Sequence, residues 1–296
     1  MERPARAIDR PGGRAGRRTD GDGRPACRRT RRRVPAAESV VSGSCAFAPI
    51  HRVDAPRVRL YCFHHAGGNA SSFSSWAGKL ADGIEIWAAQ LPNRFDTAQR
   101  PRAMIGAVLP AMIAAFDALH VGDARAVPFA FYGHSLGALI AFELARALFA
   151  AGQCGPAALA VSGHRAPDRP LRRAPLHDLA DDAFVAQLRA LGGIADGLLD
   201  DSRLRPFLLP MLRADLYMSE AYSPLPGLLL TIPLIGFRGE SDPLLTADEF
   251  DAWAAHTAAS CSLHTLPGGH FFNDVTMEQL QDLLSDALLR AVAATV

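Results

Sequence analysis

Short apolar runs alternate with helical patterns over most of this chain, and this alternation restricts the fold more than any other sequence feature. Runs of strand length lie at 58–65, 85–91, 126–132, 157–162, 232–237 and 261–266. Helical patterns lie at 72–80, 136–151 and 277–292, and capping boxes at Thr246 and Thr276 predict helix starts. Strands that alternate with helices pair in parallel and are covered on both faces. We therefore expect an α/β fold with a mostly parallel sheet flanked by helices.

One long stretch interrupts the alternation. Between Ser162 and Ile232 the sequence shows helical periodicity at 181–191 and 203–217, but no strand pattern. Because a structureless loop of this length is improbable in a compact domain, we expect a helical insertion at about 168–228. Insertions at the carboxyl ends of parallel strands tend to cover sites, so this one is predicted to be a lid.

The first 45 residues differ from the rest in composition. They are rich in Arg, Gly and Pro, and residues 1–34 carry a net charge of +8 against −7 for the remainder. Such a segment buries too little apolar surface to fold, so we expect 1–45 to be disordered and 46–296 to form the domain. The extension is either a basic arm for an acidic partner or a dispensable addition. A body that binds nucleic acid is disfavoured, since phosphate contacts require clustered positive charge.

Composition also bears on compartment. No apolar run of membrane-spanning length occurs, and the first 40 residues lack the apolar segment of a secretory signal. The five cysteines, at 27, 45, 62, 154 and 261, show no CxxC or Cys/His ligand spacing. We expect reduced thiols, a cytoplasmic setting, and no structural metal or membrane partner.

The motif Gly133-His134-Ser135-Leu136-Gly137 follows an apolar strand and opens a helix. This context is the one that a nucleophile elbow requires. The serine of such an elbow sits on a tight turn, so the positions two residues to either side must be nearly free of side chains. Gly133 and Gly137 meet that need, and we predict that Ser135 is a nucleophile.

A serine hydroxyl needs a base to act as a nucleophile. His270, in the Pro267–Phe272 segment PGGHFF, follows the last strand, where two glycines allow a sharp turn. His264 lies in a strand pattern and His256 near a helix end, so both are weaker alternatives. We expect His270 to be the base.

The base in turn needs an acid, and Asp242 lies just beyond the 232–237 strand, at the edge where sites assemble. Glu240 and Asp168 are weaker candidates. Asp248 and Asp251 fall in the first turns of a helix, where acidic side chains favour the helix dipole.

An oxyanion hole would complete such a site. The segment His65-Ala66-Gly67-Gly68 resembles the loop that donates one backbone N–H, and the residue after the nucleophile donates the other. This assigns the amides of Ala66 and Leu136, with the first donor open to a shift of one residue.

With these motifs in place, the chain from about Phe47 onward resembles the type II thioesterases, stand-alone α/β-hydrolases of polyketide and non-ribosomal peptide synthesis. The matching stretches are VRLYCFHHAGGNASSF, QLPNRF, FAFYGHSLGALIAFELA, VSGHRAP, LHDLADDAFVAQLRALGG, LLPMLRADLYMSEAY, IPLIGFRGESDPL and LPGGHFF. The resemblance implies an α/β-hydrolase fold with Ser135, Asp242 and His270 as the triad. It also implies hydrolysis of acyl thioesters on the phosphopantetheine arm of an acyl or peptidyl carrier protein, which clears stalled or misprimed carriers.

Three positions bear on this resemblance. Thioesterase domains fused to synthases usually carry their acid directly after the strand that follows the elbow helix, where this chain has Ser162 and Gly163. That difference favours Asp242 and the stand-alone type. Asn93 replaces a common glycine and His64 a common proline, which bears on the loop beside the oxyanion hole.

We expect a monomer, and the expected mechanism needs no metal or cofactor. Met211, Leu212, Leu216, Tyr217 and Met218 either line an acyl pocket or only pack the insertion on the sheet. Arg165, Arg169, Arg172 and Arg173 are either solvated or a dock for a phosphate or an acidic carrier helix. Two other functions stay open, a carboxylesterase or lipase on free esters and a non-catalytic carrier-binding scaffold.

Overall fold

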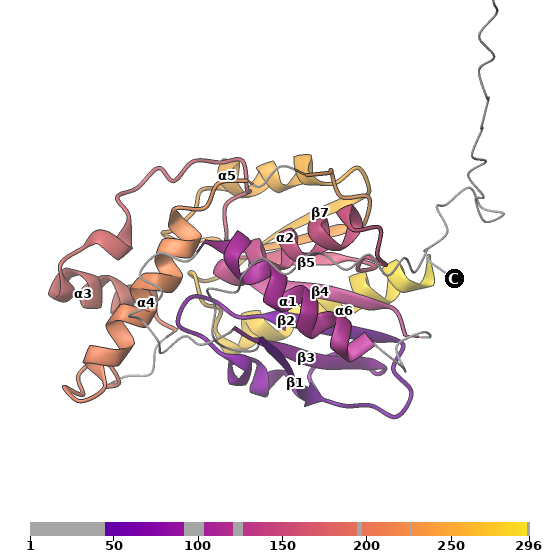
Figure 1. The fold of residues 1–296 in the computed structure, drawn as a ribbon, viewed down its shortest axis with the longest axis horizontal. Helices are drawn as coiled ribbons and strands as arrows, with labels where there is room; N and C mark the ends of the chain where they lie inside the picture. Colours follow the sequence, from indigo (N-terminus) through magenta and orange to yellow (C-terminus); the bar gives the residue numbers. More distant parts are fainter. Residues whose placement is uncertain (1–44, 92–103, 121–126, 194–196, 225–226, 295–296) are drawn as a thin grey trace, which may run out of the picture. The chain divides into compact units, whose positions relative to one another are not determined.

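A computed structural model describes residues 45–91, 104–120, 127–193, 197–224 and 227–294. A seven-stranded sheet in the order β1-β3-β2-β4-β5-β6-β7 forms its centre (Figure 1). Its strands are β1 (Ala46–His51), β2 (Val58–Phe63), β3 (Ile84–Gln90), β4 (Phe129–His134), β5 (Leu159–Ser162), β6 (Leu234–Gly239) and β7 (Cys261–Leu266). Only β1 among the described strands pairs antiparallel, so the expected mostly parallel sheet is confirmed.

The edge strand β1 is absent from the sequence-based prediction. Its sequence, AFAPIH, does not alternate clearly, and Pro49 interrupts the pattern. Pro49 lies opposite Trp87, where the register with β3 shifts. Proline has no N–H to give to a ladder, and an edge strand tolerates that loss. The segment 1–45 was expected to be disordered, and its residues 1–44 lie outside the described residues, as does the Pro92-Asn93-Arg94 segment.

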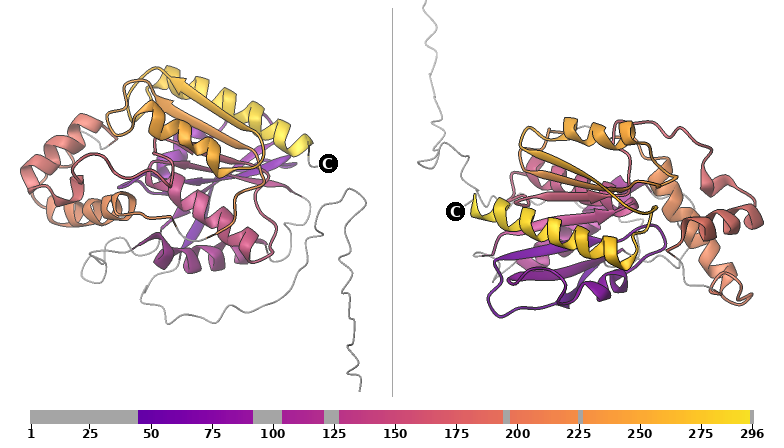
Figure 2. Two further views of the ribbon diagram at one scale, coloured as in Figure 1. Left: turned by 90° about the horizontal axis from the view of Figure 1, so that it is seen from above. Right: turned by 180° about the vertical axis from the view of Figure 1, so that it is seen from behind.

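Helices cover both faces of the sheet (Figure 2). The helices α1 (Ile105–His120) and α2 (Leu136–Ala150) pack on one face, with α5 (Ala247–Asp251) and the 3₁₀ helix η3 (Ala252–His256). The other face carries α6 (Asp274–Ala293) and the 3₁₀ helix η1 (Ala70–Trp76). Successive β2 side chains supply both cores, because neighbouring side chains of a strand point to opposite faces.

The predicted helix starts are partly correct. Thr246 forms its capping box with Glu249. The box expected at Thr276 is wrong, because α6 begins earlier, and Asn273 is the N-cap residue that accepts from the Thr276 N–H. The predicted helix at 72–80 is the shorter η1, and α1 was not predicted.

The insertion between β5 and β6 is helical, as the sequence predicts. It contains the 3₁₀ helix η2 (Leu176–Asp178), α3 (Asp181–Leu191) and α4 (Arg205–Glu220), at the left of Figure 1. Phe184, Val185 and Leu188 of α3 form a separate apolar cluster with α4, and Ala66 of the body packs against it. The insertion therefore has its own core and rests on the loop after β2.

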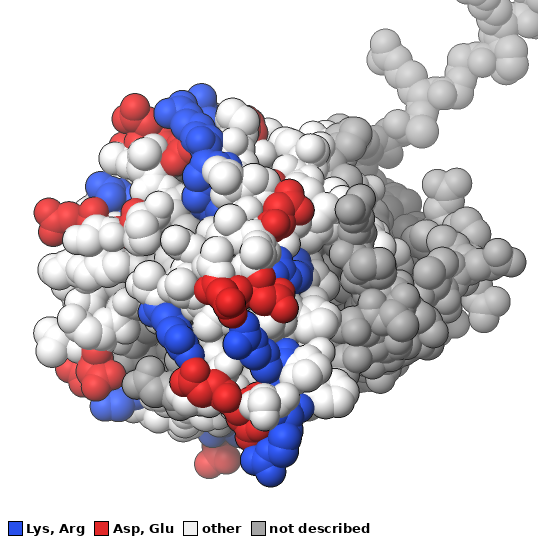
Figure 3. Space-filling model, turned by 90° about the vertical axis from the view of Figure 1, so that its left-hand side faces the viewer, with Lys and Arg blue, Asp and Glu red and all other residues white. Residues whose placement is uncertain are grey.

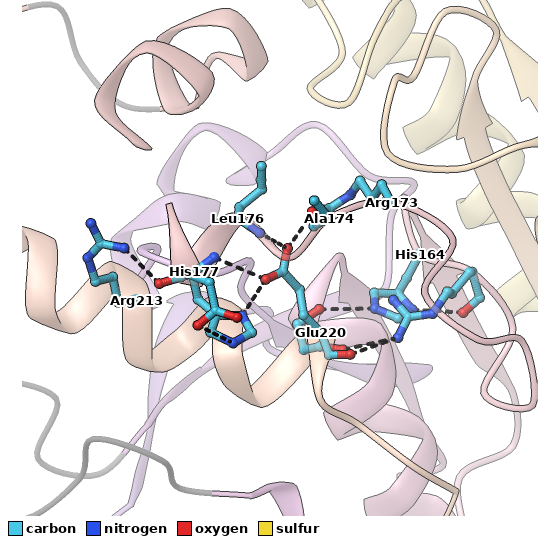
Figure 4. A network of polar contacts seen from close by, with 10 residues as sticks. His164, Arg173, Ala174, Leu176, His177, Arg213 and Glu220 are labelled. Carbon is cyan, nitrogen blue, oxygen red and sulfur yellow. Dashed lines mark hydrogen bonds and ion pairs between the residues drawn. The ribbon is translucent and has the colours of Figure 1, made fainter. Parts of the chain in front are cut away.

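A buried carboxylate fixes the base of the insertion (Figure 4). Glu220, at the end of α4, accepts hydrogen bonds from the Leu176 and His177 N–H groups and from His177 Nδ1, and pairs with Arg173 Nη1 at 2.7 Å. Arg165 Nη2 donates to the Ser219 and Glu220 carbonyls at 3.4 Å. Because the last carbonyls of a helix have no partner within it, Arg165 also caps α4.

The cysteines correct one expectation. Cys45, Cys62 and Cys261 are free thiols, whereas Cys154 takes part in a disulfide, so the expectation of reduced thiols is wrong there. The cytoplasmic setting stays a prediction. None of the helices in the described ranges is long and apolar enough to cross a bilayer.

Candidate active site

A strained turn separates β4 from α2. Ser135 has φ +54°, and it is the one non-glycine residue with positive φ in the described parts of the chain. A β-carbon at Gly133 would lie 2.1 Å from the Gly137 carbonyl oxygen, and one at Gly137 would lie 2.0 Å from the Phe63 oxygen. Only glycine fits at either position. The strand–turn–helix geometry that the motif predicts is therefore present, with Ser135 at its apex.

A second cluster comes from the ends of β6 and β7. His270 Nδ1 lies 2.9 Å from Asp242 Oδ2, and both side chains are buried. The other carboxylate oxygen, Oδ1, accepts from the Leu244 N–H at 2.9 Å. The two loops are joined directly, because the Ser241 N–H donates to the Gly268 carbonyl. Asp242 is therefore placed to orient the His270 ring and to stabilise its positive charge.

The Asp242–His270 pair lies beside the elbow. The Ser135 N–H donates to the Ser162 carbonyl at 2.7 Å. Gly163, the residue after Ser162, lies against the His270 ring, because a β-carbon added at this glycine would lie 3.3 Å from His270 Cε1. No hydrogen bond joins Ser135 Oγ to His270 in the structure. Such bonds often tighten only when substrate binds.

The weaker candidates take no part in the Asp242–His270 pair. His256 Nε2 and Asp168 bind each other at 2.8 Å. His264 stacks on Phe237 with ring centroids 5.4 Å apart. Glu240 is exposed next to the buried Asp242. Asp248 lies in the first turn of α5, and Asp251 is the last residue of that helix.

The amides of the loop after β2 differ in their hydrogen bonds. The Gly67 N–H donates to Asp215 Oδ2, and the Gly68 N–H donates to the His65 carbonyl. The Ala66 N–H makes no hydrogen bond to any described residue. The Leu136 N–H, at the first position of α2, has no acceptor within its helix. These two free amides are the pair that the sequence analysis selects as oxyanion donors.

Comparison with known families identifies residues 58–288 as a thioesterase domain. The protein belongs to the thioesterase family. This thioesterase is 36% identical over 238 residues to the "Probable cadicidin biosynthesis thioesterase" of Streptomyces griseus. The alignment covers 80% of this chain, which spans 64% of the length of that relative.

Two solved structures are similar to the thioesterase. RedJ, a thioesterase from the prodiginine pathway of Streptomyces coelicolor, is 34% identical with a TM-score of 0.69, covering 80% of this chain and 87% of RedJ. BorB, the type II thioesterase of the borrelidin cluster, is 32% identical with a TM-score of 0.68, covering 83% of this chain and 97% of BorB. The expected resemblance to type II thioesterases and the α/β-hydrolase fold are confirmed.

Two further histidines of the thioesterase, His134 and His164, are buried near the site and have lowered pKa values. Burial, with a smaller contribution from His270, holds the pKa of His134 well below its ordinary value. Burial and the neighbouring Arg165 charge lower the pKa of His164 to about 3. The His134 ring centroid lies 5.1 Å from that of His270. His134 therefore lies beside the base as a buried, uncharged ring, and Asp242 is the carboxyl group that contacts His270.

The four arginines at the start of the insertion are engaged within the thioesterase. Arg165 Nε donates to the Arg169 carbonyl, Arg169 pairs with Asp168, Arg172 with Glu249, and Arg173 with Glu220. Basic and acidic side chains are also interspersed over the end of the molecule that carries the insertion (Figure 3). Arg169–Asp168 and Arg173–Glu220 lie within the insertion, whereas Arg172–Glu249 joins it to α5 of the body.

Of the predicted pocket residues, four are buried and Tyr217 is half-buried. Met211, Leu212 and Leu216 belong to the core of the insertion, and Met218 belongs to the sheet core. Leu212 also reaches the loop at Gly67. Among the predicted pocket residues, Leu212 therefore contacts the loop after β2, which carries the Ala66 amide.

Sequence reasoning missed Asp215. It lies on the buried face of α4 between Leu212 and Leu216, and its carboxylate is 148 residues away in sequence from the amide that it binds. The sequence does contain a signal for Asp215, since it is an acid on the apolar face of a predicted helix. Such a carboxyl group needs a polar partner when it is buried.

Proposed function

We propose that the protein hydrolyses acyl thioesters held on the phosphopantetheine arm of an acyl or peptidyl carrier protein. Its role would be to clear stalled or misprimed carriers in polyketide or non-ribosomal peptide synthesis. The observation that carries the proposal is the buried Asp242–His270 pair beside the strained Ser135 turn. Family membership and the biosynthetic relatives support the substrate class.

In the proposed mechanism Ser135 Oγ attacks the thioester carbonyl carbon while His270 Nε2 takes the hydroxyl proton. Asp242 holds the ring through Nδ1 and balances the imidazolium charge. The C–S bond then breaks, and the imidazolium gives its proton to the departing thiolate. His270 next activates a water that releases the acid from the acyl-serine, which restores the enzyme.

The tetrahedral oxyanion would be bound by the Ala66 and Leu136 amides. Both N–H groups lack a partner among the described residues, so neither must break a bond to serve. Loss of one such donor reduces transition-state stabilisation by about 3 kcal/mol in related acyl transfers. No step in this scheme uses a metal or cofactor.

The helical insertion would act as the lid. It covers the carboxyl edge of the sheet, and Leu212 and Asp215 of α4 contact Gly67 in the loop after β2. The carrier protein would have to present its arm past this insertion. Because the arginines at its start are already paired, carrier docking would depend on local shape and mixed charge more than on a free basic patch.

Intact-mass spectrometry of acyl-loaded carrier proteins tests the proposal. The wild-type protein should remove the acyl mass and leave the phosphopantetheine arm. Ser135→Ala should abolish this reaction, with kcat lower by roughly 10⁶-fold. Ser260→Ala, an exposed serine before β7, is the matched control and should behave like wild type. Acyl-carrier species that persist with the wild-type protein would contradict the proposal.

Two alternatives have distinct outcomes. A carboxylesterase would use the same residues on free esters, so a higher kcat/KM for soluble oxoesters with no carrier preference would favour it. A carrier-binding scaffold would bind loaded carriers without turnover. It would also fail to react with a fluorophosphonate, which labels an activated serine.

A further inference from the structure

A contact between α4 and the loop after β2 joins the insertion to the proposed oxyanion hole. The Gly67 N–H donates to Asp215 Oδ2 at 2.8 Å, and Asp215 is only 5% exposed. A buried carboxyl group must find hydrogen-bond partners, and the Gly67 N–H is one of them. The carboxylate of α4 therefore fixes the amide of Gly67 at a site shielded from water.

The peptide unit between Ala66 and Gly67 is held at both polar groups. Asp215 accepts from its N–H, and His65 Nδ1 lies 2.8 Å from the Ala66 carbonyl oxygen. Because a peptide unit is planar, two such contacts fix the orientation of the whole plane. The Ala66 N–H belongs to the preceding peptide unit, one residue away, so its direction depends on this anchored plane.

Steric contact supports the same loop conformation. Gly67 has φ +82°, and a β-carbon there would lie 2.4 Å from Leu212 Cδ2. Leu212 stands just under one turn before Asp215 on α4. The helix thus contacts Gly67 with an apolar side chain and with a carboxyl group, and the loop adopts a backbone conformation that favours glycine.

We infer that Asp215 is a positioning residue for thioester hydrolysis. By accepting a hydrogen bond from the Gly67 N–H, Asp215 holds the loop so that the Ala66 N–H serves as the oxyanion donor. The oxyanion hole is therefore formed only when α4 is packed against this loop. This inference rests on the proposed function. It adds to that function a carboxylate of the insertion that acts on the transition state through the loop and does not touch the substrate.

The test compares Asp215→Ala, Asp215→Asn and Asp215→Glu with the wild-type protein. Kinetics are measured on an acyl-carrier thioester and on a p-nitrophenyl ester. Binding is measured for a trifluoromethyl ketone, whose adduct with Ser135 carries an oxyanion, and for a non-hydrolysable amide analogue of acyl-pantetheine. Asp182→Ala is the control, because Asp182 is an exposed acid of the same insertion whose ion pair, among the described residues, is with Arg205.

Asp215→Ala should lower kcat about 100-fold, as expected for a misplaced oxyanion donor, with KM nearly unchanged. Affinity for the trifluoromethyl ketone should fall in parallel, while the amide analogue binds as before. Asp215→Asn keeps an acceptor oxygen and should retain activity within about 10-fold of wild type. Asp215→Glu displaces the carboxylate by one methylene and should lose kcat, which keeps the test decisive if the alanine variant does not fold.

A merely structural role predicts a different pattern. All ligands would then bind more weakly together, the melting temperature would fall with activity, and asparagine would not rescue. That result, or an Asp215→Ala variant with wild-type kcat, overturns the inference while the proposed function stands. A wild-type protein that cleaves the ester but not the carrier thioester overturns the proposed substrate, and the Asp215 effect is then measured on the ester. A wild-type protein inactive on both substrates overturns both.

Discussion

Asp242 Oδ2 lies 2.9 Å from His270 Nδ1, and the two residues come from successive loops at the carboxyl edge of the sheet. Asp242 follows β6, and His270 follows β7, the neighbouring parallel strand. Parallel pairing brings the ends of these strands together. The acid and the base therefore meet although they lie 28 residues apart in the sequence.

Replacing Asp242 with asparagine tests this relationship. The amide can donate to Nδ1, which favours the wrong imidazole tautomer, so kcat should fall by about 10⁴-fold while the fold is kept. Steady-state kinetics and a melting curve measure the two effects. Glu240→Gln, on the same turn but exposed, should stay near wild type. If Asp242→Asn kept more than a tenth of the activity, another group would be the orienting acid.

Gly137 tests the backbone of the elbow. In Gly137→Ala the added carbon would lie 2.0 Å from the Phe63 carbonyl oxygen, an atom of the sheet backbone that cannot move aside. We expect a loss of more than about 3 kcal/mol in the free energy of unfolding, measured by urea denaturation.

Gly152→Ala is the matched control for this change. Gly152 follows α2 with φ +66° and has open space around its β position. It should lose only about 1 kcal/mol, from backbone strain alone. Equal losses at the two glycines would show that contact with Phe63 does not limit this turn.

The buried histidines predict a stability that depends on pH. The folded-state pKa of His164 is about 3, chiefly through burial, and that of His134 is also well below its ordinary value of 6.5. Below pH 6.5 the unfolded chain binds protons that these folded histidines refuse, so acidification favours unfolding. Stability should be fully present above pH 6.5 and fall by up to about 2 kcal/mol per histidine by pH 5.

Urea denaturation between pH 7.5 and 5 measures this dependence. His164→Gln removes one of the two groups and should flatten the slope. The glutamine can also keep a polar contact with Ser219, which His164 Nε2 contacts at 3.0 Å. A wild-type protein with constant stability over this range, or a variant with the same slope, would be incompatible with buried neutral histidines.

The sequence predicts local chemistry better than long-range contacts. Ser135 could be predicted because its turn requires glycines at 133 and 137, a constraint written in neighbouring residues. The amide partner of Asp215 could not, because it lies 148 residues away and depends on how the insertion docks.

Element boundaries show the same division. The α3 pattern predicts 181–191, and the structure places the helix at Asp181–Leu191. The edge strand β1 and the helix α1 were missed, since Pro49 and Pro110 interrupt their patterns and only packing against the sheet stabilises them. Tertiary contacts in both cases outweigh local preference.

Glu220 provides the last test, at the base of the insertion. Its side chain is 1% exposed and accepts from two backbone amides and from His177, besides pairing with Arg173 (Figure 4). Glu220→Ala would leave these donors buried without an acceptor, so we expect a loss of about 3 kcal/mol and faster proteolysis within the insertion. Asp182→Ala, which removes an exposed acid, should change the free energy of unfolding by less than about 0.5 kcal/mol.

Because the network around Glu220 anchors the end of α4, proteolytic cleavage of Glu220→Ala should be faster in the insertion while the sheet stays resistant. Uniform resistance in Glu220→Ala would mean that the apolar cluster of the insertion holds it without the carboxylate.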